Sequence, residues 1–181
     1  LTGDHGLIDK RNAYEASVKV PMIVYAPNDA KGGSTNKTRI RNLDLAPTFL
    51  DIAGIQKPKQ FEGKSAWPLI TGEQDRESWG EPDFLYQYYW EWSFPMTPTT
   101  LAITRGDIKY IQYHGIWDLE ELYDLALDPQ EKVNRINDPE YYFVRQALRT
   151  ALYAQAANPR GENAIPYLSL IHISEPTRPQ C

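Results

Sequence analysis

Cysteine is almost missing from this 181-residue chain, whose one cysteine is Cys181. The C-terminal run from Leu168 to Cys181 resembles the in-frame translation of a transposase sequencing adapter. We therefore set it apart from the native sequence as read-through, the alternative being a genuine tail. Residues 1–167 then hold no cysteine, which excludes a disulfide framework, a cysteine zinc site and a cysteine nucleophile.

The chain also lacks long apolar runs and an excess of positive charge. Its apolar runs are much shorter than the ~20 residues that cross a bilayer, so we expect no membrane segment. A net charge of -5 argues against a broad nucleic-acid surface. A local cationic pocket can nevertheless bind an anionic substrate.

Such a pocket is indicated near the first residue, where His5, Lys10 and Arg11 share one short loop. Lysine supplies a point charge and arginine a planar fork, and both suit an oxyanion. The apolar run over residues 18–26 predicts a strand buried on both faces of a parallel sheet, which would hold the loop rigid. The alternative is an ordinary polar turn that leads into a strand.

Residues 1–82 otherwise predict one helix and a long loop. The helix spans Asn42 to Gly54, with Asp44 as its cap, Pro47 in its first turn and Gly54 at its end. Residues 57–82 are expected to be loop. A strand followed by a helix favours an α/β fold class.

Residues 83–167 predict a second, antiparallel subdomain. Short strands are expected over residues 84–92, 101–104, 109–113 and 121–125. A final helix should begin at Asp138-Pro139 and cover one face of this sheet. Its expected apolar stripe consists of Phe143, Ala147, Leu148, Ala151 and Leu152.

Aromatic residues cluster at the end of the first of these strands, where Trp90, Glu91 and Trp92 are adjacent. Indole faces can stack on sugar rings and a carboxylate can bind hydroxyls, so these three residues are candidate carbohydrate contacts. The alternative is that they fill an interface within the subdomain. His114 is expected to be structural, although it could reach a cleft.

A paired-carboxylate glycosidase site at Glu120, Glu121 and Asp124 is disfavoured, because neighbouring residues of a strand face opposite ways.

The N-terminal loop resembles the loop that carries the active-site lysine of type I, formylglycine-dependent sulfatases. The resemblance rests on His5 and Lys10, then on Tyr14-Glu15-x-Ser17 and Val20-Pro21. It continues in the right order to residue 167, through residues 43–48, 61–65, 68–72, 109–111, 121–125 and 128–131.

This resemblance implies an alkaline-phosphatase-like α/β sandwich, of which residues 1–82 are the C-terminal part, followed by the small antiparallel subdomain and its helix. It implies hydrolysis of sulfate esters by formylglycine beside calcium, with Lys10 touching the sulfate. His5 would lie at the site's rim, and Arg11 would contact either substrate or Asp9. The expected substrate is a sulfated carbohydrate, because residues 7–11 and 14–15 look like N-acetylglucosamine-6-sulfatase-like members.

Residues 1–167 depart from the family in two respects. They lack the Cys/Ser-x-Pro-x-Arg motif that yields formylglycine, and they lack the calcium ligands, because Asp4-His5-Gly6 lies too close to Lys10 to be the family's metal pair. We therefore expect no metal ligands here and no activity from this polypeptide alone. The alternatives are a phosphonate or phosphate ester hydrolase of the same superfamily, and a degenerate, non-catalytic carbohydrate-binding module.

Overall fold

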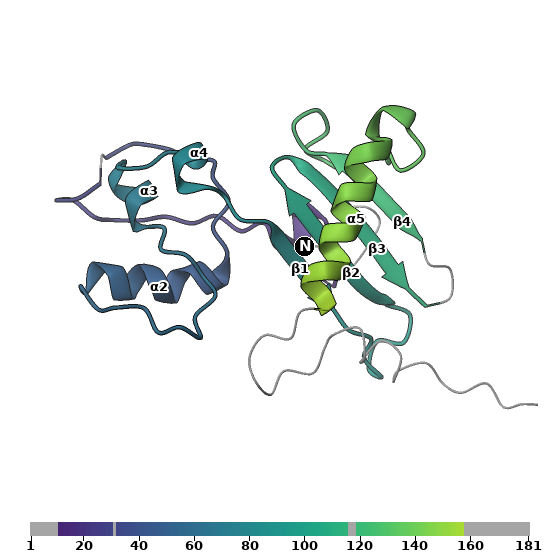
Figure 1. Cartoon of the computed structure of the whole chain (residues 1–181), viewed down its shortest axis with the longest axis horizontal. Coiled ribbons are helices and arrows are strands. Elements are labelled where there is room, and N and C mark those ends of the chain that lie inside the picture. Colours follow the sequence, from purple (N-terminus) through teal and green to yellow (C-terminus); the bar gives the residue numbers. More distant parts are fainter. Residues whose placement is uncertain (1–10, 31, 116–118, 158–181) are drawn as a thin grey trace, which may run out of the picture. The chain divides into compact units, whose positions relative to one another are not determined.

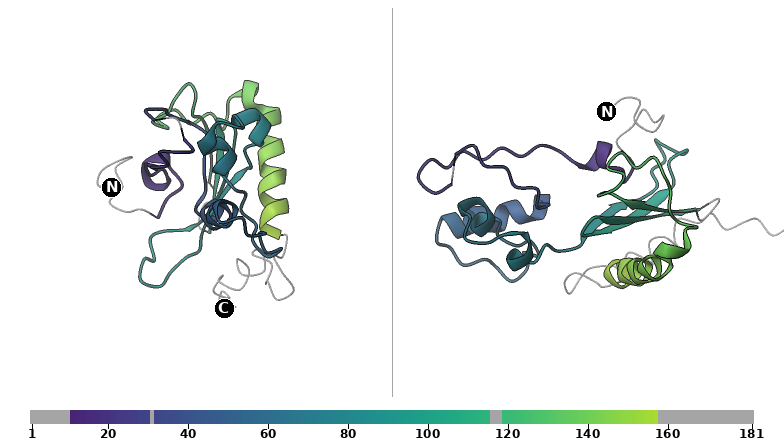
Figure 2. Two further views of the ribbon diagram at one scale, coloured as in Figure 1. Left: turned by 90° about the vertical axis from the view of Figure 1, so that its left-hand side faces the viewer. Right: turned by 90° about the horizontal axis from the view of Figure 1, so that it is seen from above.

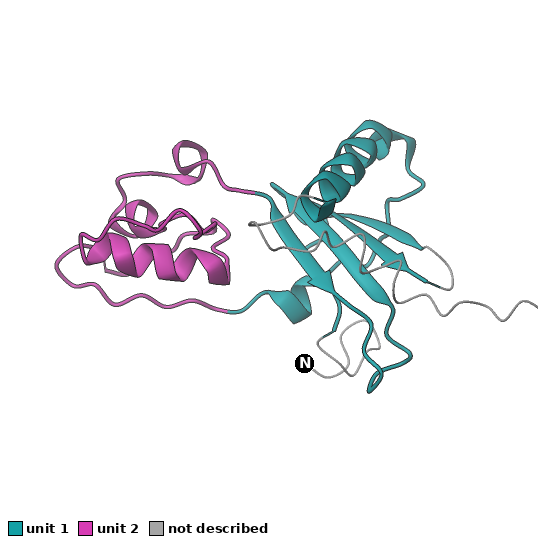
Figure 3. Ribbon diagram, turned by 60° about the horizontal axis from the view of Figure 1, so that its bottom comes forward, with its two compact units in different colours: residues 1–20, 83–181 teal, residues 21–82 magenta. Residues whose placement is uncertain are grey.

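The structure, a computed structural model, describes residues 11–30, 32–115 and 119–157 (Figure 1). These residues form two compact units (Figure 3). The first unit contains residues 11–20 together with those from 83 onward, and the second contains residues 21–82. None of the described helices is long and apolar enough to cross a membrane.

A four-stranded antiparallel sheet forms the centre of the first unit. Its strands are β1 (Phe84–Tyr88), β2 (Thr99–Arg105), β3 (Ile108–His114) and β4 (Glu120–Asp124), and they lie side by side in sequence order. All four predicted strands are therefore confirmed, although β1 ends at Tyr88 rather than Trp92. In the register, Ile103 of β2 lies opposite Tyr110 of β3, and Ala102 lies opposite Ile111.

The predicted covering helix is present as α5 (Tyr142–Ala157), which lies across one face of the sheet (Figure 1). It follows a short 3₁₀ turn, Pro139–Tyr141, at whose start the Asp138 side chain accepts a hydrogen bond from the Glu140 N–H. Its buried side pairs Leu148, Leu152 and Ala156 with Leu101, Ile103 and Tyr110 of the sheet. The predicted stripe is wrong at Phe143 and Ala147, which are exposed, because the face in contact with the sheet passes through Val144 and Leu148 instead.

The opposite face of the sheet is covered by the N-terminal segment, which the sequence did not predict. The single-turn helix α1 (Glu15–Val18) lies on the opposite side of the sheet from α5 (Figure 2). Just before it, Ala13 and Tyr14 pack against Ala102, Ile111 and Tyr123. With both faces covered, the interior of β2 is buried at every position from Thr99 to Thr104.

The prediction of a strand over residues 18–26 is wrong, because these residues form no strand in the structure. After α1, residues 19–26 form neither helix nor strand, and Val20, Ile23 and Tyr25 are exposed. A parallel strand needs neighbours to bond its backbone and cover its two apolar faces. The described part of the chain supplies none to this segment.

Among its described residues, the second unit contains three helices, namely α2 (Asn42–Ile52), α3 (Trp67–Thr71) and α4 (Arg76–Trp79). The expectation of a loop over residues 57–82 is therefore wrong at α3 and α4. Asp44 is not the cap of α2 but its third residue, where it accepts hydrogen bonds from the backbone and side chain of Arg41. Pro47 lies within the helix rather than in its first turn. Ala66, Leu69 and Trp79 form the buried core of the unit.

A backbone crossing holds the second unit together at Gly63. Pro47 has no N–H to donate to the carbonyl of Leu43, and the chain at Gly63 passes directly over that carbonyl. A Cβ atom at position 63 would lie 1.8 Å from the Leu43 oxygen. Next to it, Lys64 N–H donates to the Asp44 carboxylate at 2.8 Å.

Gly63→Ala should therefore lower the free energy of unfolding of the second unit by about 1–3 kcal/mol, because backbone atoms must move apart to admit the methyl group. Gly32→Ala is the matched control, since a Cβ atom there meets open space. Urea unfolding of the two variants checks the difference, and equal stabilities would contradict the crossing.

Asp44 makes the stability of the second unit dependent on pH. Burial opposes ionisation of Asp44, but hydrogen bonds from the Arg41 side chain and from the Lys64 and Arg41 N–H groups outweigh it and lower its pKa. This contribution should be complete above the unfolded pKa of about 3.9 and should disappear as the pH falls through the lower folded value. Urea unfolding between pH 7 and pH 2.5 should show this loss for the natural chain. Asp44→Asn should unfold at a lower urea concentration than the natural chain at pH 7, and its stability should depend less on pH. Asp29→Asn, which changes an exposed carboxylate, is the control and should leave the pH dependence of stability unchanged.

Candidate functional site

The predicted site residues fall partly outside the described residues. Lys10 and His5 lie there, so their positions stay predictions. Arg11 is described, and its Nε lies 3.5 Å from Glu91 Oε1. Its guanidinium carbon also lies 3.3 Å from the centre of the Phe94 ring. The structure thus brings Arg11 and Glu91, two of the predicted substrate contacts, together as an ion pair stacked on an aromatic ring.

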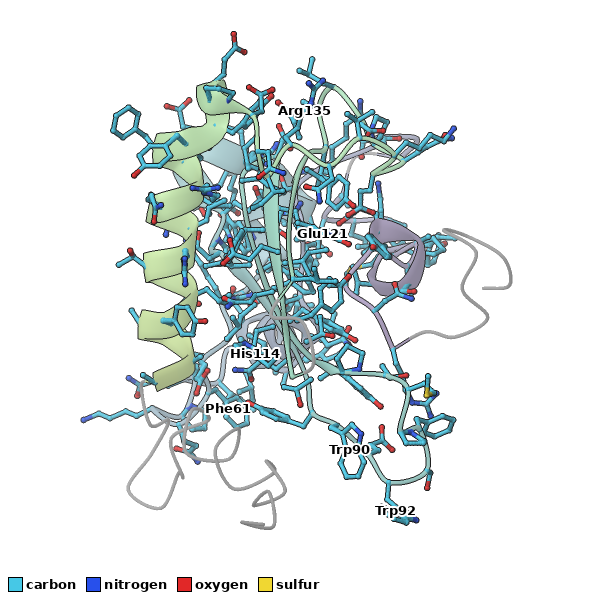
Figure 4. The ribbon with its side chains drawn as sticks, turned by 90° about the vertical axis from the view of Figure 1, so that its right-hand side faces the viewer. Phe61, Trp90, Trp92, His114, Glu121 and Arg135 are labelled. Atoms are coloured by element: carbon cyan, nitrogen blue, oxygen red, sulfur yellow. The ribbon has the colours of Figure 1, made fainter. Side chains whose placement is uncertain are left out.

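Trp90 and Trp92 belong to the loop between β1 and β2 (Figure 4). The Trp90 N–H donates to Thr99 Oγ1, and its indole N–H donates to the carbonyl of Pro95 at 3.3 Å. The two indole rings meet edge to face with their centres 6.1 Å apart. Trp92 is 85% exposed and Trp90 is 40% exposed, so this loop presents aromatic surface to solvent.

A buried ammonium group connects the N-terminal segment to the sheet. Lys109 projects from β3, is 1% exposed, and contacts three oxygens with its Nζ. These are the backbone carbonyl of Ala13 at 2.8 Å, Glu131 Oε1 at 2.7 Å and Glu15 Oε1 at 2.8 Å. The second oxygen of Glu131 accepts from the Glu15 N–H at 2.6 Å. The backbone on either side of Tyr14 is therefore held by two charged side chains.

The Tyr14 side chain is held in turn by a cluster of tyrosines around Glu121. One oxygen of Glu121 accepts hydrogen bonds from Tyr14, Tyr113 and Tyr123, at 2.8, 3.3 and 3.1 Å. Burial raises the pKa of all three hydroxyls, and the Glu121 carboxylate raises them further. At neutral pH they therefore remain protonated donors, as the carboxylate requires.

This arrangement rules out a paired-carboxylate glycosidase site at Glu120 and Glu121. Glu121 lies on the side of the sheet away from α5 (Figure 4). Glu120 faces the other side, where it forms an ion pair with Arg149 of α5 at 3.4 Å. Asp124 accepts a hydrogen bond from Tyr141. The His114 ring packs edge to face against the Tyr153 ring, with the ring centres 6.3 Å apart.

No group of three or more His, Cys, Asp or Glu side chains in the described part of the chain could hold a metal ion. These residues therefore do not fit the calcium that the family resemblance implies. A Ser-x-Pro-x-Arg run does occur at residues 174–178, but it lies within the excluded C-terminal stretch and outside the described residues.

Comparison with known proteins decides the family. Residues 3–158 match the family model described as N-sulphoglucosamine sulphohydrolase, C-terminal. The chain belongs to the sulfatase family.

Two sulfatase relatives illustrate the match. The N-acetylglucosamine-6-O-sulfatase of Bacteroides thetaiotaomicron is 34% identical over 139 residues, covering 77% of this chain and 25% of that protein. The human N-acetylglucosamine-6-sulfatase is 30% identical over 171 residues, covering 77% and 30%.

Among solved structures, a protein in complex with its substrate D-glucosamine-2-N,6-O-disulfate is 32% identical and superposes with a TM-score of 0.77. The match covers 86% of this chain and 31% of that one. The fold class expected from the sequence, with its antiparallel sheet and covering helix, is thereby confirmed. This sulfatase chain spans about a quarter to a third of the length of the proteins it matches.

Sequence reasoning missed Lys109, Glu131 and Glu15 as an interacting group. All three lie in segments that carry the family resemblance, at residues 14–15, 109–111 and 128–131. Their charges alone indicated exposed positions, because isolated Lys and Glu residues are seldom buried. No signal in the sequence links the three residues, because their contacts join positions 22 to 116 residues apart.

Proposed function

We propose that the protein containing this chain hydrolyses sulfate esters of a sulfated carbohydrate. The observation that carries the proposal is the family match over residues 3–158, which includes the Lys10 loop. The relatives support a sugar substrate, since two are named N-acetylglucosamine-6-sulfatases and another is named a Δ4,5-hexuronate-2-O-sulfatase. No comparable observation favours a phosphonate or phosphate ester.

In this proposal Lys10 is the catalytic residue of the chain. Its ammonium group would donate to the sulfate and to the departing ester oxygen, where negative charge develops during cleavage. His5 would lie at the rim of the site and bind substrate. Formylglycine and calcium would come from the parts of the protein that correspond to the remaining two thirds or more of its relatives.

The loop between β1 and β2 would bind the sugar. Its exposed indoles, Trp90 and Trp92, offer apolar faces for stacking. Glu91 of this loop and Arg11 of the N-terminal segment add hydrogen-bonding groups beside them. The ion pair with Glu91 also indicates what Arg11 would bind. Its guanidinium contacts Glu91 and Phe94, so we propose that it binds neutral sugar hydroxyls rather than the sulfate.

Lys10→Ala should lower kcat/KM for sulfate release by about 10²- to 10³-fold in the full-length protein, expressed with its maturation enzyme. The assay is sulfate release from N-acetylglucosamine 6-sulfate and from an aryl sulfate. Lys59→Ala removes an exposed lysine and should leave both rates unchanged. Full activity of the Lys10 variant would contradict its role, and sugar binding without any sulfate release by the natural protein would favour a non-catalytic module.

Trp92→Ala should raise KM for the sulfated sugar about five- to tenfold, equivalent to ~1–1.4 kcal/mol. The aryl sulfate, which has no sugar to stack, should react at nearly the natural rate. Phe143→Ala is the control, because it removes an equally exposed aromatic ring from α5. Equal losses on both substrates would argue against a sugar-binding loop.

A further inference from the structure

The Lys109–Glu131 pair is poorly explained as a means of stabilising the fold. Each side chain is only 1% exposed, so both charges have lost their hydration. The desolvation cost of a buried pair often exceeds the attraction between its charges, and apolar residues of similar size commonly stabilise as well or better. A buried pair of this kind therefore calls for an explanation in terms of geometry.

Lys109 and Glu131 both bind backbone groups of the N-terminal segment. Lys109 donates to the carbonyl of Ala13, and Glu131 accepts from the N–H of Glu15. These two groups flank Tyr14, so the path of the chain is fixed there independently of the Tyr14 side chain. Tyr14 is then fixed separately, by its hydroxyl on Glu121 and by its ring against Tyr123.

Glu131 holds its position at a conformational cost. Its φ is 54°, and it is the one non-glycine residue with positive φ among those that the structure describes. This left-handed conformation is unfavourable for a residue with a side chain. In this conformation the Glu131 carboxylate accepts hydrogen bonds from both the Glu15 N–H and the Lys109 ammonium group.

We propose that Lys109 and Glu131 are positioning residues for Lys10. The inference rests on the proposed function, in which Lys10 contacts the sulfate. Lys10 precedes Ala13 by three residues, so fixing the backbone at residues 13–15 limits the positions open to the lysine. Small displacements of a catalytic group can reduce the rate about a hundredfold.

The informative variant is Lys109→Met with Glu131→Leu in the full-length protein. Replacing both residues removes the bonds to Ala13 and Glu15, and it leaves the Glu15 carboxylate, whose side chain is 18% exposed, as the one charged group of the three. We expect kcat for sulfate release to fall about 10- to 100-fold, with KM within about twofold and the melting temperature near that of the natural protein. Glu131→Gln, a smaller change, should give a weaker effect in the same direction.

Arg105→Met is the matched control. It removes an ion pair between Arg105 of β2 and Asp83, the residue that precedes β1. Its kcat should equal that of the natural protein. A second control combines the paired replacement with Lys10→Ala. If the pair acts through Lys10, the further loss in kcat should disappear in that background, whereas a general loss of folding would persist.

Amide hydrogen exchange separates failure of this inference from failure of the proposed function. Exchange at the Glu15 N–H should be at least tenfold faster in the paired replacement than in Arg105→Met, whatever reaction the protein catalyses. Unchanged exchange, or an unchanged kcat in a protein that does release sulfate, would overturn the positioning role. Faster exchange in a protein without sulfatase activity would overturn the proposed function, and with it the link from this anchor to Lys10.

Discussion

The buried ammonium of Lys109 is the interaction that fixes where the N-terminal segment lies on the sheet of the first unit. It lies between the sheet and the N-terminal segment, and it is what allows a backbone carbonyl and two carboxylates to be buried there together. Without it, the carboxylates of Glu15 and Glu131 would repel each other at the place where Ala13 and Tyr14 cover the sheet. The apolar contacts of Ala13 and Tyr14 with Ala102, Ile111 and Tyr123 are therefore bordered by charges that neutralise one another.

Most of the second half of the chain could be predicted from its sequence. The strands from β1 to β4 are short and separated by tight turns such as Gly106, and α5 begins at a clear Asp-Pro signal. Such elements are determined by local contacts and by the packing of one sheet on one helix. The covering of the other sheet face was missed because the contacts join residues about a hundred positions apart. Periodicity within a short window carries no information about such partners.

The candidate site, too, could be predicted from the sequence only in part. Residue types and spacing were enough to single out the Lys10 loop and the aromatic loop, but not to pair Arg11 with Glu91, whose positions are unrelated in sequence. The failure of the predicted strand over residues 18–26 has a different cause. Its apolar pattern is suited to burial between two layers, and a pattern specifies a strand only when the neighbouring strands and layers are present. The same run is exposed here.

The anchoring of the N-terminal segment also affects the order in which the chain can fold during synthesis. Ala13 and Lys109 are 96 residues apart, and Glu15 and Glu131 are 116 apart. At roughly 5–20 residues per second, the segment is made about 5–20 s before its partners. The second unit, by contrast, is one continuous stretch and can form during this delay. The segment beside Lys10 is therefore made well before the residues that anchor it, and it can reach its final place only after they have been made.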